Sequence, residues 1–128
     1  MAITLGINEN ADGLLLTIGG MFTSADLPAL YVWASRVARA IAKVHTETNT
    51  KAKVLIDIQK LEGYKDPEVL TILAMLMKTD NPHVYKTASF GGSLGNEMAE
   101  ELIKMMAGRD NLKNFKTEVE ARAWLDVV

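Results

Sequence analysis

The residue with the clearest chemical potential in this 128-residue chain is Asp57, which lies in the otherwise apolar run Val54-Leu55-Ile56-Asp57-Ile58. A buried carboxylate can serve as a catalytic base. More often such a group accepts hydrogen bonds from the amides of the next loop or caps a helix. Since open α/β sheets bind ligands near the carboxyl ends of their strands, the position of Asp57 is compatible with either role.

A glycine-rich segment, Gly91-Gly92-Ser93-Leu94-Gly95-Asn96, lies between a predicted strand and a predicted helix. Backbone N–H groups in such a loop, together with the dipole of the following helix, could hold an anion. The segment is not a phosphate-binding loop of the Gly-Lys-Ser/Thr type, and it does not match the dinucleotide-binding pattern. The alternative is an ordinary connection between a strand and a helix.

His45 and His83 are far apart in the sequence, and neither has another histidine at helical ligand spacing. Transition-metal sites usually need three or four converging ligands, so we predict no metal site. The chain has no cysteine, which excludes thiolate ligands, disulfides and cysteine nucleophiles. No serine lies in a nucleophile-elbow context, and we predict neither a catalytic triad nor a cofactor.

The net charge of −2 gives no field that favours nucleic acid, and we predict no nucleic-acid binding. The apolar runs are shorter than the ~20 residues of a membrane span, and the N-terminus does not resemble a signal peptide. We therefore expect a cytoplasmic protein without an integral membrane segment. Tyr31 and Trp33 lie off the centre of a predicted helix stripe, and we expect them to form a contact with a partner or with a second copy in a homodimer.

These residues must be positioned by alternating strands and helices. Residues 3–7 and 14–18 have the periodicity of strands and flank an Asp-Gly turn, which predicts a hairpin; Gly19 and Gly20 are expected to end its second strand. Further strands are predicted at 54–58, 84–90 and 114–116. Helices are predicted after the capping sequences Thr23–Asp26 and Thr117–Glu120, after Asp66-Pro67-Glu68, and over 97–107, with loops at 46–50 and 59–65.

The predicted order is β-β-α-β-α-β-α-β-α. It implies one α/β domain over residues 1–128, with a five-stranded, mixed and mostly parallel sheet and four helices. In such a sheet the segments that follow the parallel strands meet at one edge. We therefore expect Phe22, Thr23, Asp57, Tyr64, Lys65, Ser93 and Asn96 to share a binding rim.

Three stretches carry a resemblance to a known family: Ile18 to Asp26, Val54 to Ile58, and Phe115 to Leu125, the last close to F-x-x-x-x-x-A-x-x-W-L. In their order and spacing they resemble the SpoIIAA-like branch of the STAS superfamily, the sporulation anti-anti-sigma proteins grouped with lipid-binding CRAL-TRIO domains. Phosphorylatable members of that family carry a serine between the central strand and the next helix. Here Gln59 to Asp66 contains no Ser or Thr, and its one hydroxyl is that of Tyr64.

The resemblance implies a non-enzymatic regulatory or binding module that acts by protein–protein contact, or that holds a small apolar or anionic ligand. Two alternatives stay open. A lipid carrier would need a continuous apolar cavity between the sheet and the methionine-rich helices. A small hydrolase or transferase would use Asp57 together with Tyr64 or Ser93.

Overall fold

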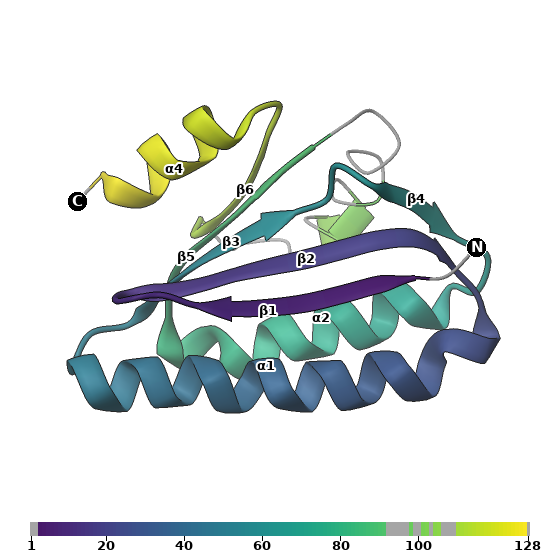
Figure 1. Cartoon of the computed structure of the whole chain (residues 1–128), viewed down its shortest axis with the longest axis horizontal. Helices are drawn as coiled ribbons and strands as arrows, with labels where there is room; N and C mark the ends of the chain where they lie inside the picture. Colours follow the sequence, from purple (N-terminus) through teal and green to yellow (C-terminus); the bar gives the residue numbers. More distant parts are fainter. Residues whose placement is uncertain (1–2, 92–97, 99–100, 103, 106–109, 128) are drawn as a thin grey trace.

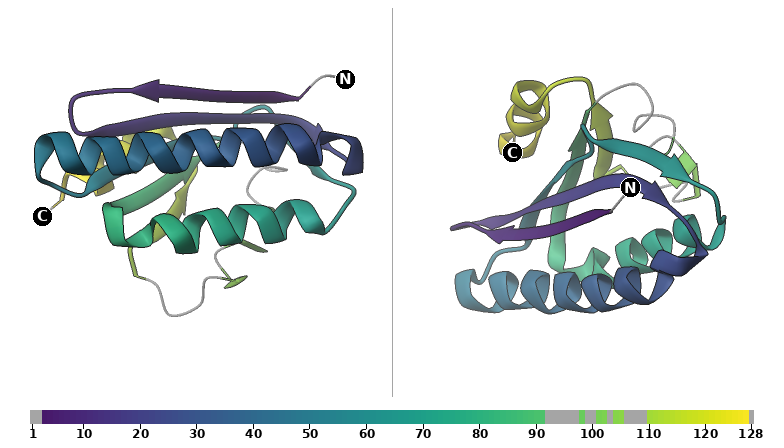
Figure 2. Two further views of the ribbon diagram at one scale, coloured as in Figure 1. Left: turned by 90° about the horizontal axis from the view of Figure 1, so that it is seen from below. Right: turned by 45° about the vertical axis from the view of Figure 1, so that its right-hand side comes forward.

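A mixed β-sheet with helices on both faces forms the scaffold of the protein (Figure 1). The computed structural model describes residues 3–91, 98, 101–102, 104–105 and 110–127. Helices α1 and α2 lie side by side against one face of the sheet, as the view from below shows, and α4 covers the other face (Figure 2). The described elements are β1 (Thr4–Glu9), β2 (Gly13–Phe22), α1 (Leu27–Thr48), β3 (Ala52–Asp57), β4 (Leu61–Tyr64), α2 (Glu68–Asp80), β5 (Val84–Phe90), β6 (Leu112–Phe115) and α4 (Glu118–Asp126).

The strand order is β1-β2-β3-β5-β6, and β4 pairs with β2 off this path. β1 runs antiparallel to β2, whereas every other pairing is parallel. The α/β class and the mixed, mostly parallel sheet predicted from the sequence are therefore confirmed. The parallel strands consequently have their carboxyl ends at the same edge of the sheet; they are β2, β3, β4, β5 and β6.

Strand β2 is longer than predicted, because it continues through Gly19 and Gly20 to Phe22. Gly20 has a φ of 92°, and the register of β2 shifts between Gly20 and Met21. Glycine accepts this backbone conformation without steric cost, so the strand bends there instead of ending. The prediction that the glycine pair ends the strand was wrong.

The segment 61–64 was predicted as part of a loop, but it forms an additional strand, β4, so that the sheet has six strands instead of the predicted five. β4 pairs in parallel with the last residues of β2, with Gly20 opposite Leu61 and Phe22 opposite Tyr64. Its four residues, which include Gly63 at a φ of 137°, show no strand periodicity. The pairing with β2 and the burial of Leu61 hold the segment in place, and neither is visible in the local sequence.

Helix α1 follows a short 3-10 turn, Ser24–Asp26. The carboxylate of Asp26 accepts hydrogen bonds from the Thr23 backbone N–H at 2.9 Å and from its hydroxyl at 3.3 Å, as the predicted capping sequence requires. The helix runs to Thr48, past its predicted end. It stops at Asn49, which has a left-handed backbone with φ 57°.

The other predicted helix starts are confirmed. Asp66 accepts from the Glu68 backbone N–H at 2.9 Å before α2, and Thr117 accepts from the Glu120 N–H at 3.3 Å before α4. Three α-helices have bounds in the part of the chain that the structure describes. The fourth predicted helix, 97–107, falls largely outside the described residues. Strand β6 begins two residues earlier than predicted, at Leu112.

Two apolar clusters pack on opposite faces of the sheet. The larger joins β2 and β3 to α1 and α2, and its most buried side chains include Phe22, Leu30 and Val69. The smaller joins Leu55 and Phe90 to Ala121 and Leu125 of α4. Alternate residues of β3 therefore face different helices, which explains why this strand is nearly all apolar.

Candidate functional site

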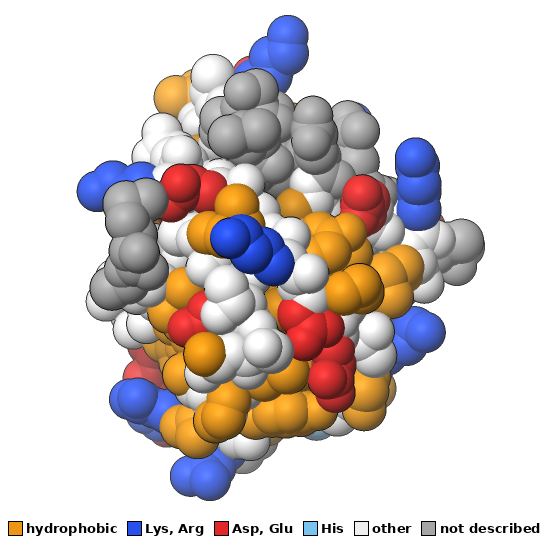
Figure 3. Space-filling view, turned by 90° about the vertical axis from the view of Figure 1, so that its right-hand side faces the viewer, with side chains coloured by type: hydrophobic (Ala, Val, Ile, Leu, Met, Phe, Trp, Pro, Cys, Tyr) orange, Lys and Arg blue, Asp and Glu red, His pale blue; other side chains and the backbone are white. Residues whose placement is uncertain are grey.

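The pairing of β4 with β2 builds one end of the molecule, where both strands end and where α1 and α2 begin. Phe22 lies opposite Tyr64, and the Lys65 backbone N–H donates to the Phe22 carbonyl at 2.7 Å. We call this end the β2–β4 rim and define it by Thr23, Tyr64, Lys65 and Glu101. Figure 3 views this end and shows hydrophobic side chains over its lower half, with carboxylates among them.

Phe22 was predicted to supply an exposed apolar contact at the rim, and this prediction was wrong. Its side chain is 1% exposed and belongs to the core between the sheet and α1 and α2. The pairing with β4 covers the end of β2 and turns Phe22 inward. Thr23 is half-buried and is engaged with Asp26 at the entry to α1.

Tyr64 is the rim residue with the most specific geometry. Its hydroxyl donates a hydrogen bond of 2.5 Å to the Glu101 carboxylate. This hydrogen bond raises the pKa of the Tyr64 phenol, and partial desolvation and the negative charge of Glu101 raise it further. Tyr64 is half-buried and packs against the larger core, while Lys65 beside it is exposed.

Among the described residues, those of the β2–β4 rim and its sequence neighbours include more carboxylates than cations. Glu62, Asp66, Glu68 and Glu101 lie on β4, on the start of α2 and beside Tyr64, whereas Lys60 and Lys65 are the nearby cations. Exposed apolar side chains lie close in sequence to the same end, because Tyr31 (51% exposed) and Val32 (62%) belong to the first turns of α1.

Asp57 does not join the rim. Strand alternation places it on the face of Leu55 and opposite Phe90, the side covered by α4, whereas Tyr64 packs on the other face. Its carboxylate accepts a 2.9 Å hydrogen bond from the Gln59 backbone N–H. This is the structural role that the sequence left open beside the catalytic one. Ser93 and Asn96 lie outside the described residues.

The two predicted interface aromatics differ. Tyr31 is exposed, as expected, but Trp33 is 5% exposed and belongs to the larger core. Its indole N–H donates to the Gly6 carbonyl at 3.3 Å, so the residue joins α1 to β1. The prediction for Trp33 was wrong because α1 is covered on two sides, by β1 and by the central strands.

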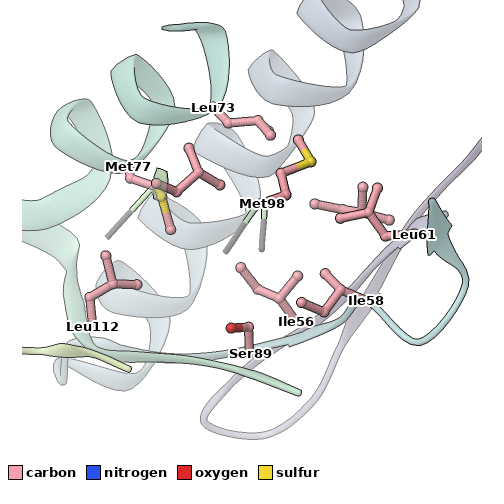
Figure 4. Close-up of a pocket in the computed structure, with 10 residues that line it drawn as sticks. Ile56, Ile58, Leu61, Leu73, Met77, Ser89, Met98 and Leu112 are labelled. Carbon is pink, nitrogen blue, oxygen red and sulfur yellow. The ribbon is translucent and has the colours of Figure 1, made fainter. Parts of the chain in front are cut away.

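Two small apolar cavities lie between the sheet and the helices. The first, of about 40 Å³, is lined by side chains such as Ile56, Leu73, Met77 and Met98 (Figure 4). The second has a volume of about 50 Å³ and extends toward Trp33 and the buried Asp80. Five residues line both cavities: Ile18, Ile56, Leu73, Met77 and Leu102. Both are far smaller than the about 300–1,000 Å³ of ordinary small-molecule sites.

The structure also brings together His45 and His83, which are far apart in the sequence. Their Nδ1 atoms lie 2.9 Å apart, and the rings are half-buried. The sequence contains part of the signal for this contact, and the structure supplies the rest by making β3 and β5 neighbours. Each histidine lies near the end of a helix that leads into β3 or β5, and adjacent parallel strands start at the same edge of a sheet.

Among the residues that the structure describes, no group of three or more His, Cys, Asp or Glu side chains is arranged to hold a metal ion. Within the same residues, no helix is long and apolar enough to cross a membrane.

Comparison with solved structures defines the fold class. An uncharacterised DUF3478-family protein from Shewanella loihica PV-4, with a SpoIIAA-like fold, matches 96% of this chain and 93% of its own (TM-score 0.61, 20% identity). An anti-sigma factor antagonist from Mycobacterium paratuberculosis matches 98% and 96% (TM-score 0.65, 15% identity). A scan against protein-family models and a search of curated proteins found no match. The chain therefore has a SpoIIAA-like fold, as the resemblance in its sequence implied.

Proposed function

We propose that the chain is a regulatory protein-interaction module that binds a protein partner at the β2–β4 rim. The observation that carries the proposal is the pairing of β4 with β2, which sets the half-buried Tyr64 and its Glu101 partner beside the exposed Lys65. The likeness to an anti-sigma factor antagonist supports a role in protein contact. That likeness concerns the fold, and the contact surface is argued from the rim.

The partner surface follows from the charges at the rim. Glu62 and Glu68 flank Tyr64 in sequence, and Tyr31 adds exposed apolar surface on α1. A complementary surface would carry lysine or arginine around a small apolar patch. A homodimer through the predicted aromatic pair would rely on Tyr31 without Trp33, because Trp33 is buried.

A small apolar ligand is the second candidate. It is favoured by the shared apolar walls of the two cavities, which include Ile18, Ile56 and Leu73. A lipid carrier would have to enlarge this space by displacing α2, since neither cavity approaches the size of a drug-sized site. A hydrolase or transferase that combines Asp57 with Tyr64 gains no support, because the two side chains lie on opposite faces of the sheet.

The proposal can be tested with two matched double variants, each of which changes the net charge by +4. Glu62→Lys with Glu68→Lys alters the rim, and Glu47→Lys with Asp110→Lys alters exposed positions away from it. Proteins captured from an extract of the native cells would be purified, and their affinities for the wild type and both variants measured by calorimetry.

We expect a captured protein to form a stoichiometric complex with the wild type. The rim variant should weaken that complex at least about tenfold, a loss of about 1.4 kcal/mol, while the control variant stays within about twofold. Equal weakening by both variants would place the contact elsewhere. If no captured protein forms such a complex, the protein-interaction role fails, and retention of an apolar molecule, read by native mass spectrometry, would favour the second candidate.

A further inference from the structure

His45 and His83 are the only two histidines of the chain, and they meet although 38 positions separate them. Each is held by a helical segment: His45 lies in the last turn of α1, and His83 ends the 3-10 turn Asn81–His83. The rings meet edge to face, with centroids 5.2 Å apart and an interplanar angle of 65°. The structure therefore places two imidazole nitrogens within hydrogen-bond distance of each other.

The spacing of the two Nδ1 atoms matches one kind of metal coordination. An ion bound at about 2.05 Å from each nitrogen would subtend an N–metal–N angle of about 90° across their 2.9 Å separation. That is the angle between neighbouring ligands in square-planar and octahedral complexes, which Ni(II) and Cu(II) prefer. A tetrahedral Zn(II) site would need the nitrogens about 3.3 Å apart.

The buried Asp80 supplies the charge that favours a cation here. It precedes His83 by three residues at the start of the same 3-10 turn, and its side chain is 4% exposed. Its Oδ2 atom is buried with no hydrogen-bond partner. An ionised carboxylate beside His83 favours positive charge on or near that ring.

We propose that His45 and His83 bind a Ni(II) or Cu(II) ion as neighbouring ligands through their Nδ1 atoms, with water in the remaining positions. In the metal-free protein one Nδ1–H donates to the other Nδ1. On binding, the donor ring carries its hydrogen on Nε2 instead, and both Nδ1 lone pairs face the ion. Because both rings are half-buried, solvent can reach the site. The site is independent of the β2–β4 rim.

The test uses tag-free full-length protein and the single variants His45→Gln and His83→Gln. Ni(II) binding is measured by calorimetry with nickel chloride, and the Cu(II) complex is examined by electron paramagnetic resonance for coupling to nitrogen. The wild type should bind one Ni(II) ion with a dissociation constant below about 10 µM, and its Cu(II) spectrum should show two coupled imidazole nitrogens.

Each single variant should lose at least about tenfold in Ni(II) affinity and show coupling to one imidazole nitrogen at most. Far-UV circular dichroism confirms that the variants are folded, and Glu47→Gln serves as a control beside His45. The proposal is overturned if the wild type binds Ni(II) no more tightly than the single variants. It is also overturned if the Cu(II) spectrum of the wild type shows one coupled nitrogen or none.

Discussion

The indole N–H of Trp33 donates a hydrogen bond to the backbone carbonyl of Gly6, with 3.3 Å between the nitrogen and the oxygen. This bond ties the second turn of α1 to β1, which pairs with β2 along its other side. An edge strand with one partner depends on such additional contacts for its stability. Trp33 is therefore a residue of the scaffold, and Tyr31 two positions earlier is a residue of the surface.

Trp33→Ala should destabilise the protein by about 3–5 kcal/mol, because it removes a buried aromatic side chain and leaves a cavity. Tyr31→Ala should change the free energy of unfolding by no more than about 0.5 kcal/mol, since half of that side chain is exposed. Urea unfolding followed by circular dichroism measures both. Similar losses for the two variants would contradict the assignment of Trp33 to the core.

Gly13→Ala should be among the most damaging small substitutions in the chain. A Cβ atom at Gly13 would lie 1.8 Å from the Lys53 carbonyl oxygen, so β2 and β3 would have to separate locally. We expect a loss of about 3 kcal/mol or more in the free energy of unfolding. Gly6→Ala is the matched control on β1, because its Cβ would meet Thr17 at 3.4 Å, an ordinary contact. Equal effects in urea unfolding would refute the argument.

Asp80 should make stability fall as the pH rises from 4 to 6. Burial raises its pKa from 3.8 to about 6 in the folded protein, against a smaller lowering by His83. Between these values the folded state keeps a proton that the unfolded state has lost, so the cost of ionising Asp80 grows with pH and is complete above about pH 6. The full cost is of the order of 3 kcal/mol.

The variant Asp80→Asn removes this titration. Relative to the wild type, its free energy of unfolding should increase by up to about 3 kcal/mol between pH 4 and pH 7. Urea unfolding at several pH values gives the difference, in which the titration of the other carboxylates largely cancels. A difference that does not vary with pH would show that Asp80 titrates normally.

Glu101→Gln should lower the pKa of Tyr64 toward the ordinary phenol value of 10.0, because the hydrogen bond to a carboxylate is the main cause of its increase. The Tyr64 ring signals, followed by NMR between pH 8 and 12, report the change. Glu118→Gln is the control, since that carboxylate pairs with Arg122 on α4. An unchanged Tyr64 titration in Glu101→Gln would mean that the hydrogen bond contributes little.

Periodicity and capping chemistry predicted most of the scaffold. The capping residues Thr117 and Asp66 make their predicted hydrogen bonds, and the apolar run of β3 is buried on both faces. These features depend on neighbours in the sequence, which local patterns record. The structure of residues 18–20 and 61–64 depends instead on pairing between distant segments. Gly20 bends β2 without ending it because residues 20–22 pair with β4.

The candidate site was less predictable for the same reason. Whether Phe22 faces solvent depends on β4, and whether Trp33 is buried depends on β1, so both required knowledge of distant pairings. Asp57 was placed at the correct strand end but on the face away from Tyr64. The contact between His45 and His83 depends on the strand order, which a single sequence does not provide.

Strand β2 changes partners along its length: residues 13–17 pair with β3, and residues 20–22 pair with β4. Three residues, 58–60, join the two partner strands. Lengthening or shortening this link by one residue would re-register β4 against β2 while leaving β3 where it is, and a one-residue slip exchanges the faces of a strand. The β2–β4 rim can thus be remodelled by insertions and deletions that leave the main sheet intact.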